Sequence, residues 1–116
     1  MKTSELIGPA LDWAVAKCEG AYISKESDEP FWLEGIVAAP CFLDKYQPST
    51  DWEQGGPIIE REKIELSIDC AEVFCWWAQH QLSDSMEHGH TPLIAAMRCY
   101  VASKLGDEVE IPEELK

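Results

Sequence analysis

The chain has 116 residues, about the length of one domain, which is enough for a single modest core. Its 22 acidic and 9 basic side chains give a formal net charge of −13, so a nucleic-acid backbone would be repelled unless the few cations gathered on one face. We therefore expect no direct binding to nucleic acid, and no association with a membrane, because no apolar run approaches the roughly 20 residues that a spanning helix needs.

The acidic surface has two interpretations. It can be a solvated surface that keeps the protein soluble, or it can imitate DNA and occupy the basic groove of a DNA-binding protein. Cysteine usage is more informative about location. The five cysteines are odd in number, follow no Cys-x-x-Cys spacing and come without a secretory signal. We expect a soluble cytoplasmic protein with free thiols.

The N-terminal half predicts one helix followed by short strands. Apolar residues recur at helical spacing between Pro9, which suits a first helical position, and Gly20, which suits a stop. Residues 24–30 are rich in charge, serine and proline, which is typical of a loop. Residues 31–33 and 36–38 have strand-like composition, with a hairpin or bulge between them.

The C-terminal half has clearer patterns. Residues 64–68 alternate between apolar and polar, which predicts a strand with one buried face, and the aromatic run 73–78 should pair antiparallel with it. Residues 83–89 are expected to form a loop. Thr91 then caps a helix whose apolar stripe continues to Gly106.

Trp76 and Trp77 are adjacent in the aromatic run, so a strand must place them on opposite faces. One of the two therefore lies outside the core that buries the other. A second helix layer, a partner subunit or a ligand could cover it, so a homo-oligomer is one possibility.

Together these elements predict an α+β fold, with a small and mainly antiparallel sheet on which the N-terminal and C-terminal helices pack. Residues 1–106 are expected to form the single domain. Residues 107–116 form an acidic tail, either disordered or a strap, in which Val109 and Ile111 are the only anchors.

Several runs of the sequence also resemble those of a known protein family. The run Gln-Pro-Ser-Thr-Asp-Trp-Glu-Gln-Gly-Gly-Pro that opens residues 47–62, together with residues 3–6, 10–20 and 91–108, resembles the NinX family of small proteins from lambdoid bacteriophages. The resemblance covers roughly half of the chain and brings no assigned activity. More distantly, the order of elements is similar to that of the phage α-β-α sandwich domains, which implies the same α+β architecture.

The segment from Tyr46 to Pro57 is the predicted binding site. It lies between regular elements and combines an aromatic platform with a few hydrogen-bonding groups, as binding surfaces do. One residue among Ser49, Thr50 and Asp51 could cap a helical turn, and the whole loop could be a structural corner instead. The residues that we expect to contact a partner or ligand are Tyr46, Ser49, Thr50, Asp51, Trp52, Gln54, Gly55 and Gly56.

Metal and nucleophile chemistry is not expected. The soft-ligand residues do not follow the spacings of structural zinc sites, and no third group that could orient a Cys/His pair is visible in the sequence. We therefore expect no metal and no cofactor. The residues of suitable type for a metal site or a Cys/His pair are Cys70, Cys75, His80, His88 and His90.

These observations favour a non-enzymatic phage or prophage accessory protein that binds a host or phage protein. The alternative is a domain that binds or sequesters a small molecule, such as a nucleotide-like signal, since Trp52 and the Gly55-Gly56-Pro57 turn could hold a ring. An enzyme is the least favoured class, because no catalytic motif is present.

Overall fold

The computed structural model describes residues 1–36, 39–69 and 75–116. It confirms the α+β class, but the strands form two antiparallel three-stranded sheets, in the orders β1-β2-β3 and β4-β5-β6, where one sheet was expected. The helices are α1 (Gly8–Cys18), α2 (Trp52–Glu62) and α3 (Pro92–Leu105). The strands are β1 (Tyr22–Ser24), β2 (Trp32–Glu34), β3 (Cys41–Phe42), β4 (Ile64–Asp69), β5 (Cys75–His80) and β6 (Met86–Gly89).

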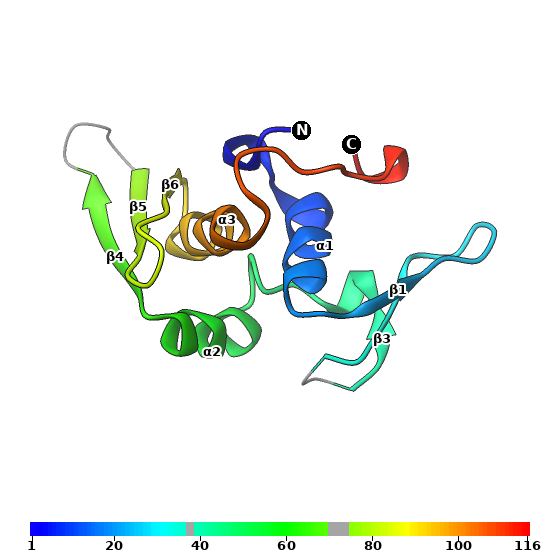
Figure 1. Ribbon diagram of the computed structural model, residues 1–116. Coiled ribbons are helices and arrows are strands. Elements are labelled where there is room, and N and C mark those ends of the chain that lie inside the picture. Colours follow the sequence, from blue (N-terminus) through cyan, green and yellow to red (C-terminus); the bar gives the residue numbers. More distant parts are fainter. Residues whose placement is uncertain (37–38, 70–74) are drawn as a thin grey trace.

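Helix α3 is the centre of the molecule. It lies between the β4-β5-β6 sheet and α1, and α2 crosses below it (Figure 1). Its start is as expected, because the Thr91 side chain accepts a hydrogen bond from the Ile94 N–H at 3.1 Å and Pro92 takes the first helical position. The helix is apolar on nearly every side. Its buried residues are Leu93, Ile94, Ala95, Ala96, Met97, Cys99, Tyr100 and Val101.

The β4-β5-β6 sheet packs one face on α3. Ile64 pairs with His80 and Leu66 with Ala78, as the alternating pattern predicted. Trp76 packs against the core, and its neighbour Trp77 therefore points to the opposite face. The first two residues of the expected aromatic strand, Val73 and Phe74, lie outside the described residues.

One expectation for this sheet was wrong. The second half of the predicted loop 83–89 is strand β6, which completes the sheet by pairing with β5. In the N-terminal half, the loop expected at residues 24–30 is confirmed except at Ser24, which ends β1, a strand that the sequence did not predict and that pairs with β2. Of the strand piece expected at residues 36–38, Ile36 lies in a bend and the other two residues are outside the described part of the chain.

The largest correction concerns α2. The predicted loop ends at Trp52, and the helix then runs through the Gly55-Gly56-Pro57 sequence that was interpreted as a turn. Asp51 caps it by accepting a hydrogen bond from the Glu53 N–H at 2.9 Å. Glu60 and Glu62 also lie in this helix. Lys63 ends it in the left-handed conformation, with φ of 58°.

The two ends of the chain lie side by side (Figure 1). Thr3 Oγ1 donates a hydrogen bond to the carbonyl oxygen of Gly106 at 2.6 Å. Met1 and Val109 exchange two hydrogen bonds, each of 2.9 Å. Val109 and Ile111 are both 6% exposed. Residues 107–116 therefore form a strap over the start of the chain. Among the described residues, no helix combines the length and apolar character needed to span a membrane.

Candidate functional site

The residues of the predicted binding loop do not share one surface. Trp52 is 53% exposed at the first position of α2, and Thr50 is also exposed. Tyr46 and Ser49 are buried, at 6% and 1% exposure. Burial raises the pKa of the Tyr46 hydroxyl well above its usual range, which keeps it neutral. The expected aromatic platform is therefore a single exposed ring, that of Trp52.

The polar residues of the same loop bind one another. Gln54 Nε2 donates to Asp51 Oδ2 at 3.0 Å and to the Lys45 carbonyl at 3.1 Å, and Gln54 Oε1 accepts from the Gln47 N–H at 2.9 Å. Gly55 is buried and Gly56 is half-buried, both inside α2. These contacts close a corner between the chain before α2 and the helix itself. The side chains of Asp51 and Gln54 thus stabilise this corner of the fold.

A pocket of about 570 Å³ opens beside this corner. Four segments that are distant in sequence form it: the start of α1, the chain between β1 and β2, the chain between β3 and α2, and the C-terminal strap. Figure 1 shows these segments around α1 and β1. The lining residues are Gly8, Pro9, Asp12, Lys25, Asp28, Glu29, Pro30, Phe31, Leu43, Asp44, Gln47, Thr50, Glu114 and Leu115.

Asp12 is the notable group in this pocket. It is 4% exposed, and its Oδ1 accepts a hydrogen bond from the Ser49 N–H at 3.0 Å. Burial raises the pKa of Asp12 to about 6, although the N–H and hydroxyl of Ser49 oppose this shift. Ser49 Oγ is itself buried and makes no hydrogen bond of good geometry. Among the described residues, Asp12 has no ion-pair partner.

The rest of the pocket is apolar in its walls and acidic around them. The pocket has five acidic residues and, among its described lining residues, one cation, Lys25. Lys25 Nζ donates to the Ser27 carbonyl at 2.8 Å and lies 5.9 Å from the Phe31 ring centre. The acidic residues are Asp12, Asp28, Glu29, Asp44 and Glu114, and the apolar walls come from Pro9, Pro30, Phe31, Leu43 and Leu115. The arrangement suits a cationic group on an apolar stem and repels an anion.

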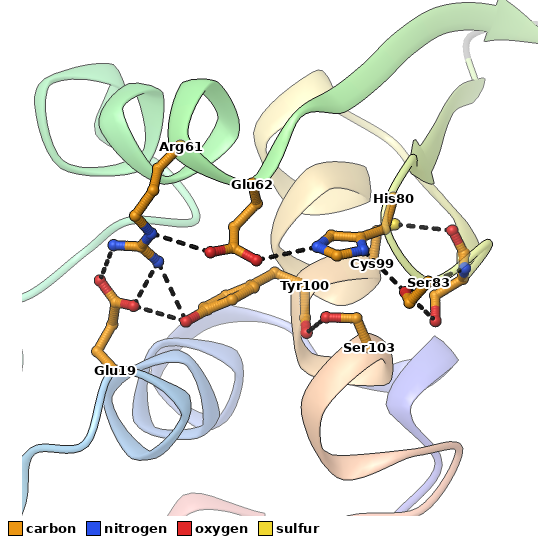
Figure 2. Close-up of polar contacts among 9 residues, drawn as sticks. Glu19, Arg61, Glu62, His80, Ser83, Cys99, Tyr100 and Ser103 are labelled. Atoms are coloured by element: carbon orange, nitrogen blue, oxygen red, sulfur yellow. Dashed lines mark hydrogen bonds and ion pairs between the residues drawn. The ribbon is translucent and has the colours of Figure 1, made fainter.

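A second pocket, of about 480 Å³, is lined by Tyr46 and Gln54 and also by Glu19 and Arg61. Glu19 and Arg61 belong to a polar network that joins α1, α2 and α3 (Figure 2). Arg61 bonds Glu19 through two nitrogens, at 2.6 and 3.0 Å, and the Tyr100 hydroxyl donates to Glu19 at 2.6 Å. The polar groups of this network bond to one another, so the network holds the three helices together.

The network continues to a Glu-His-Ser chain. Glu62 Oε1 is 2.9 Å from His80 Nε2, and His80 Nδ1 is 2.8 Å from Ser83 Oγ, as Figure 2 shows. Burial would raise the pKa of Glu62, but hydrogen bonds from His80 and Arg61 outweigh it and hold that pKa below its usual value. The composition is that of a nucleophilic triad. However, Ser83 belongs to the β5–β6 turn, and neither pocket includes His80 or Ser83.

The cysteines and histidines considered as possible metal ligands are not brought together where the structure describes them. Cys70 lies outside the described residues. Among the others, no group of three His, Cys, Asp or Glu side chains could hold a metal ion. His80 is buried and bound to Glu62, while His88 and His90 are exposed.

Sequence reasoning missed Asp12 and the residues around it. The one available signal was a charged residue directly between Leu11 and Trp13 in a helix that is apolar on both sides of it. Phe31 was assigned to a strand and Leu115 to the tail. Their meeting beside α1 depends on long-range packing and has no local pattern.

A model of one protein family matches most of this chain. The family model described as Bacteriophage P22, NinX matches residues 2–104. The match begins before α1 and ends within α3, so it includes every helix and both sheets. No curated protein matches the chain.

Proposed function

Because the chain belongs to the family Bacteriophage P22, NinX, we propose that it is a phage accessory protein that acts by binding another protein, of the phage or of its host. The family supplies the phage context. The mode of action is supported by the surface around α1 and the start of α2.

The observation that carries this proposal is the acidic pocket beside an exposed tryptophan. Thr50 lines the pocket, and Trp52 comes two residues later in the chain. Trp52 is 53% exposed. Tryptophan is enriched among the residues that dominate protein interfaces, where it fills pockets of the partner. An acidic cavity next to such a ring offers one anchor for an apolar group and one for a basic group.

Binding is favoured over catalysis by the chemistry of the same pocket. Its described lining residues include no histidine, cysteine or serine, and no hydrogen bond joins their one hydroxyl group, that of Thr50, to a carboxylate that could act as its base. The triad-like chain at Glu62, His80 and Ser83 has a structural explanation, because it ties the end of α2 to the turn after β5.

A small-molecule ligand is the second candidate, because the pocket volume falls within the ~300 to 1,000 Å³ that is usual for such sites. The nucleotide-like signal considered from the sequence is disfavoured, since its phosphates would meet five acidic residues and one lysine. A thermal-shift screen tests this class. A ligand present at 100 times its dissociation constant should add about 2.7 kcal/mol to the free energy of unfolding.

The protein-binding proposal is tested by site-specific photocrosslinking in infected cells. A photoreactive amino acid at Gln47, on the pocket, should capture one protein reproducibly, and the same amino acid at Ser67, on β4, should not. The purified partner is then titrated by calorimetry. Trp52→Ala should weaken binding at least tenfold without changing the melting temperature. Leu82→Ala, at an apolar residue that is 74% exposed in the β5–β6 turn, is the matched control.

Two results would count against the proposal. One is capture of the same proteins from Gln47 and Ser67, which indicates non-specific contact. The other is an unchanged affinity of Trp52→Ala for the captured protein.

A further inference from the structure

The pocket beside α1 has the chemistry of a receptor for a basic side chain. We propose that it receives a lysine or arginine side chain of the bound protein, with the cationic head group paired to Asp12 and the aliphatic stem against the walls formed by Phe31, Leu43 and Leu115. This inference rests on the proposed function, because the bound protein supplies the side chain.

The first support is the state of Asp12 itself. The residue is 4% exposed, yet the Ser49 N–H gives its carboxyl group the one hydrogen bond of good geometry among the described residues, where it also has no ion pair. Buried carboxylates are normally paired or fully hydrogen-bonded, because removing the charge from water is costly. Asp12 lines an open pocket, so an entering cation can complete its partners.

The second support is Ser49, which adjoins Asp12. Its Oγ is buried without a hydrogen bond of good geometry, although the residue is only 1% exposed. A buried hydroxyl without a partner is rare in folded proteins. Two buried polar groups that are short of hydrogen-bond partners are thus adjacent. Asp12 is the one of them that lines the pocket, and its carboxyl group can accept from a head group with several N–H donors.

The third support is the distribution of charge. Lys25 is the only cation among the described lining residues, and it does not neutralise Asp12. Its Nζ bonds the Ser27 carbonyl and lies over the Phe31 ring. Asp28, Glu29, Asp44 and Glu114 add negative charge around the pocket. A cation is therefore attracted to the entrance before it reaches the buried carboxyl group.

The shape of the pocket favours a side chain over a bare ion. Proline, phenylalanine and leucine side chains form the walls, and a volume of about 570 Å³ exceeds what a hydrated cation requires. Lysine and arginine carry a charged group on an aliphatic stem, and they bury that stem along apolar surfaces. Their chemistry matches both parts of the pocket.

The test uses the intact chain and a matched pair of probes. N-acetyl-arginine amide and N-acetyl-citrulline amide have nearly the same shape but differ in charge. Each is titrated into ¹⁵N-labelled protein while the backbone amide signals of Asp12, Phe31 and Ser49 are followed. We expect saturable shifts with the arginine compound, and at least tenfold weaker binding of the citrulline compound.

Two isosteric variants control for overall charge. Asp12→Asn should weaken binding of the arginine compound at least tenfold, whereas Glu5→Gln, an exposed acid outside the pocket, should leave it unchanged. Equal binding of both probes, or equal losses in both variants, would overturn the inference, because each result shows that Asp12 does not recognise the cation.

Two further results separate this inference from the proposed function. If Asp12→Asn binds the captured partner as well as the unmodified protein does, while Trp52→Ala does not, the protein-binding function stands and the inference fails. If 1,4-diaminobutane binds more tightly than the arginine compound and displaces no captured partner, the pocket serves a free amine. That outcome also overturns the assignment to a partner's side chain.

Discussion

Gly55 lies directly against the carbonyl oxygen of Pro48. A Cβ atom at Gly55 would be 2.4 Å from that oxygen and 2.7 Å from Leu93 Cδ2, whereas a Cβ atom at the neighbouring Gly56 would meet nothing within 4 Å. The contact lets α2 pack closely on the chain that precedes it and on α3. It also explains why a glycine, normally unfavourable in a helix, occupies this position.

The two adjacent glycines give a matched stability test. Gly55→Ala should lower the free energy of unfolding by about 2 kcal/mol or more, because the backbone of Pro48 must move. Gly56→Ala should raise it by up to ~1 kcal/mol, through the higher helix propensity of alanine. Urea denaturation of both variants measures the difference. Similar values for the two would show that α2 does not approach Pro48 as closely as described.

Asp12 predicts an unusual dependence of stability on pH. Its pKa rises from an ordinary 3.8 to about 6 in the folded protein, so the folded state binds the proton more tightly than the unfolded state. The stabilisation by this proton is full below pH 4 and is lost as the pH rises through about 6, with a total of ~3 kcal/mol.

Asp12→Asn tests this dependence because asparagine keeps an acceptor for the Ser49 N–H. The variant should be more stable than the unmodified protein at pH 7, by up to ~3 kcal/mol, and about equal to it at pH 3.5. Melting temperatures at the two pH values measure the effect. A variant that is less stable at pH 7 would show that the hydrogen bond to Ser49 outweighs the cost of burying the charge.

The C-terminal strap is expected to contribute to stability. The sequence left residues 107–116 as either a disordered tail or a strap, but Val109 and Ile111 are each only 6% exposed. Replacing both with alanine should cost roughly 3 to 5 kcal/mol, comparable with the 2 to 5 kcal/mol expected for Met97→Ala in the core. Glu110→Ala, at an exposed residue between them, serves as the control. Calorimetric melting that leaves the double variant unchanged would mean that the strap is not bound in solution.

The Tyr100 hydroxyl joins α3 to α1 through Glu19. Tyr100→Phe removes its 2.6 Å bond to Glu19 and its 3.2 Å bond from Arg61, and should cost about 1.5 kcal/mol. The cost stays at the low end for a charged network because Arg61 is half exposed and continues to bind Glu19. Tyr22→Phe, on β1 where the ring is 71% exposed, should have no measurable effect in the same denaturation experiment.

The parts of the fold that the sequence predicted are those with local signals. The Thr91-Pro92 cap and the apolar repeat of α3, the proline start of α1 and the alternation in β4 depend on neighbours within a few residues. The missed parts depend on distant contacts. Helix α2 includes Gly55, Gly56 and Pro57, which local rules assign to a turn, and it persists because Asp51 caps it and Ile58 is buried.

The candidate site was anticipated only at its edge. Gln47, Thr50 and Trp52 lie in or beside the predicted loop, so the loop was a useful guide to the region. Asp12 could not be found from spacing, because its burial arises when the chain before α2 folds over α1 and the Ser49 N–H reaches it from 37 positions away. A helical pattern records which side is apolar but gives no information about what will cover it.

The all-round burial of α3 also constrains how this family can diverge. A residue on α3 that changes size must be compensated on the sheet, on α1 or on α2, depending on its direction, so single substitutions there should rarely be neutral. Residues 26–30 of the β1–β2 turn are exposed by contrast, and this segment contributes Lys25, Asp28, Glu29 and Pro30 to the lining of the acidic pocket. Substitutions in that turn can therefore change the charge and shape of the pocket while the helical centre keeps its packing.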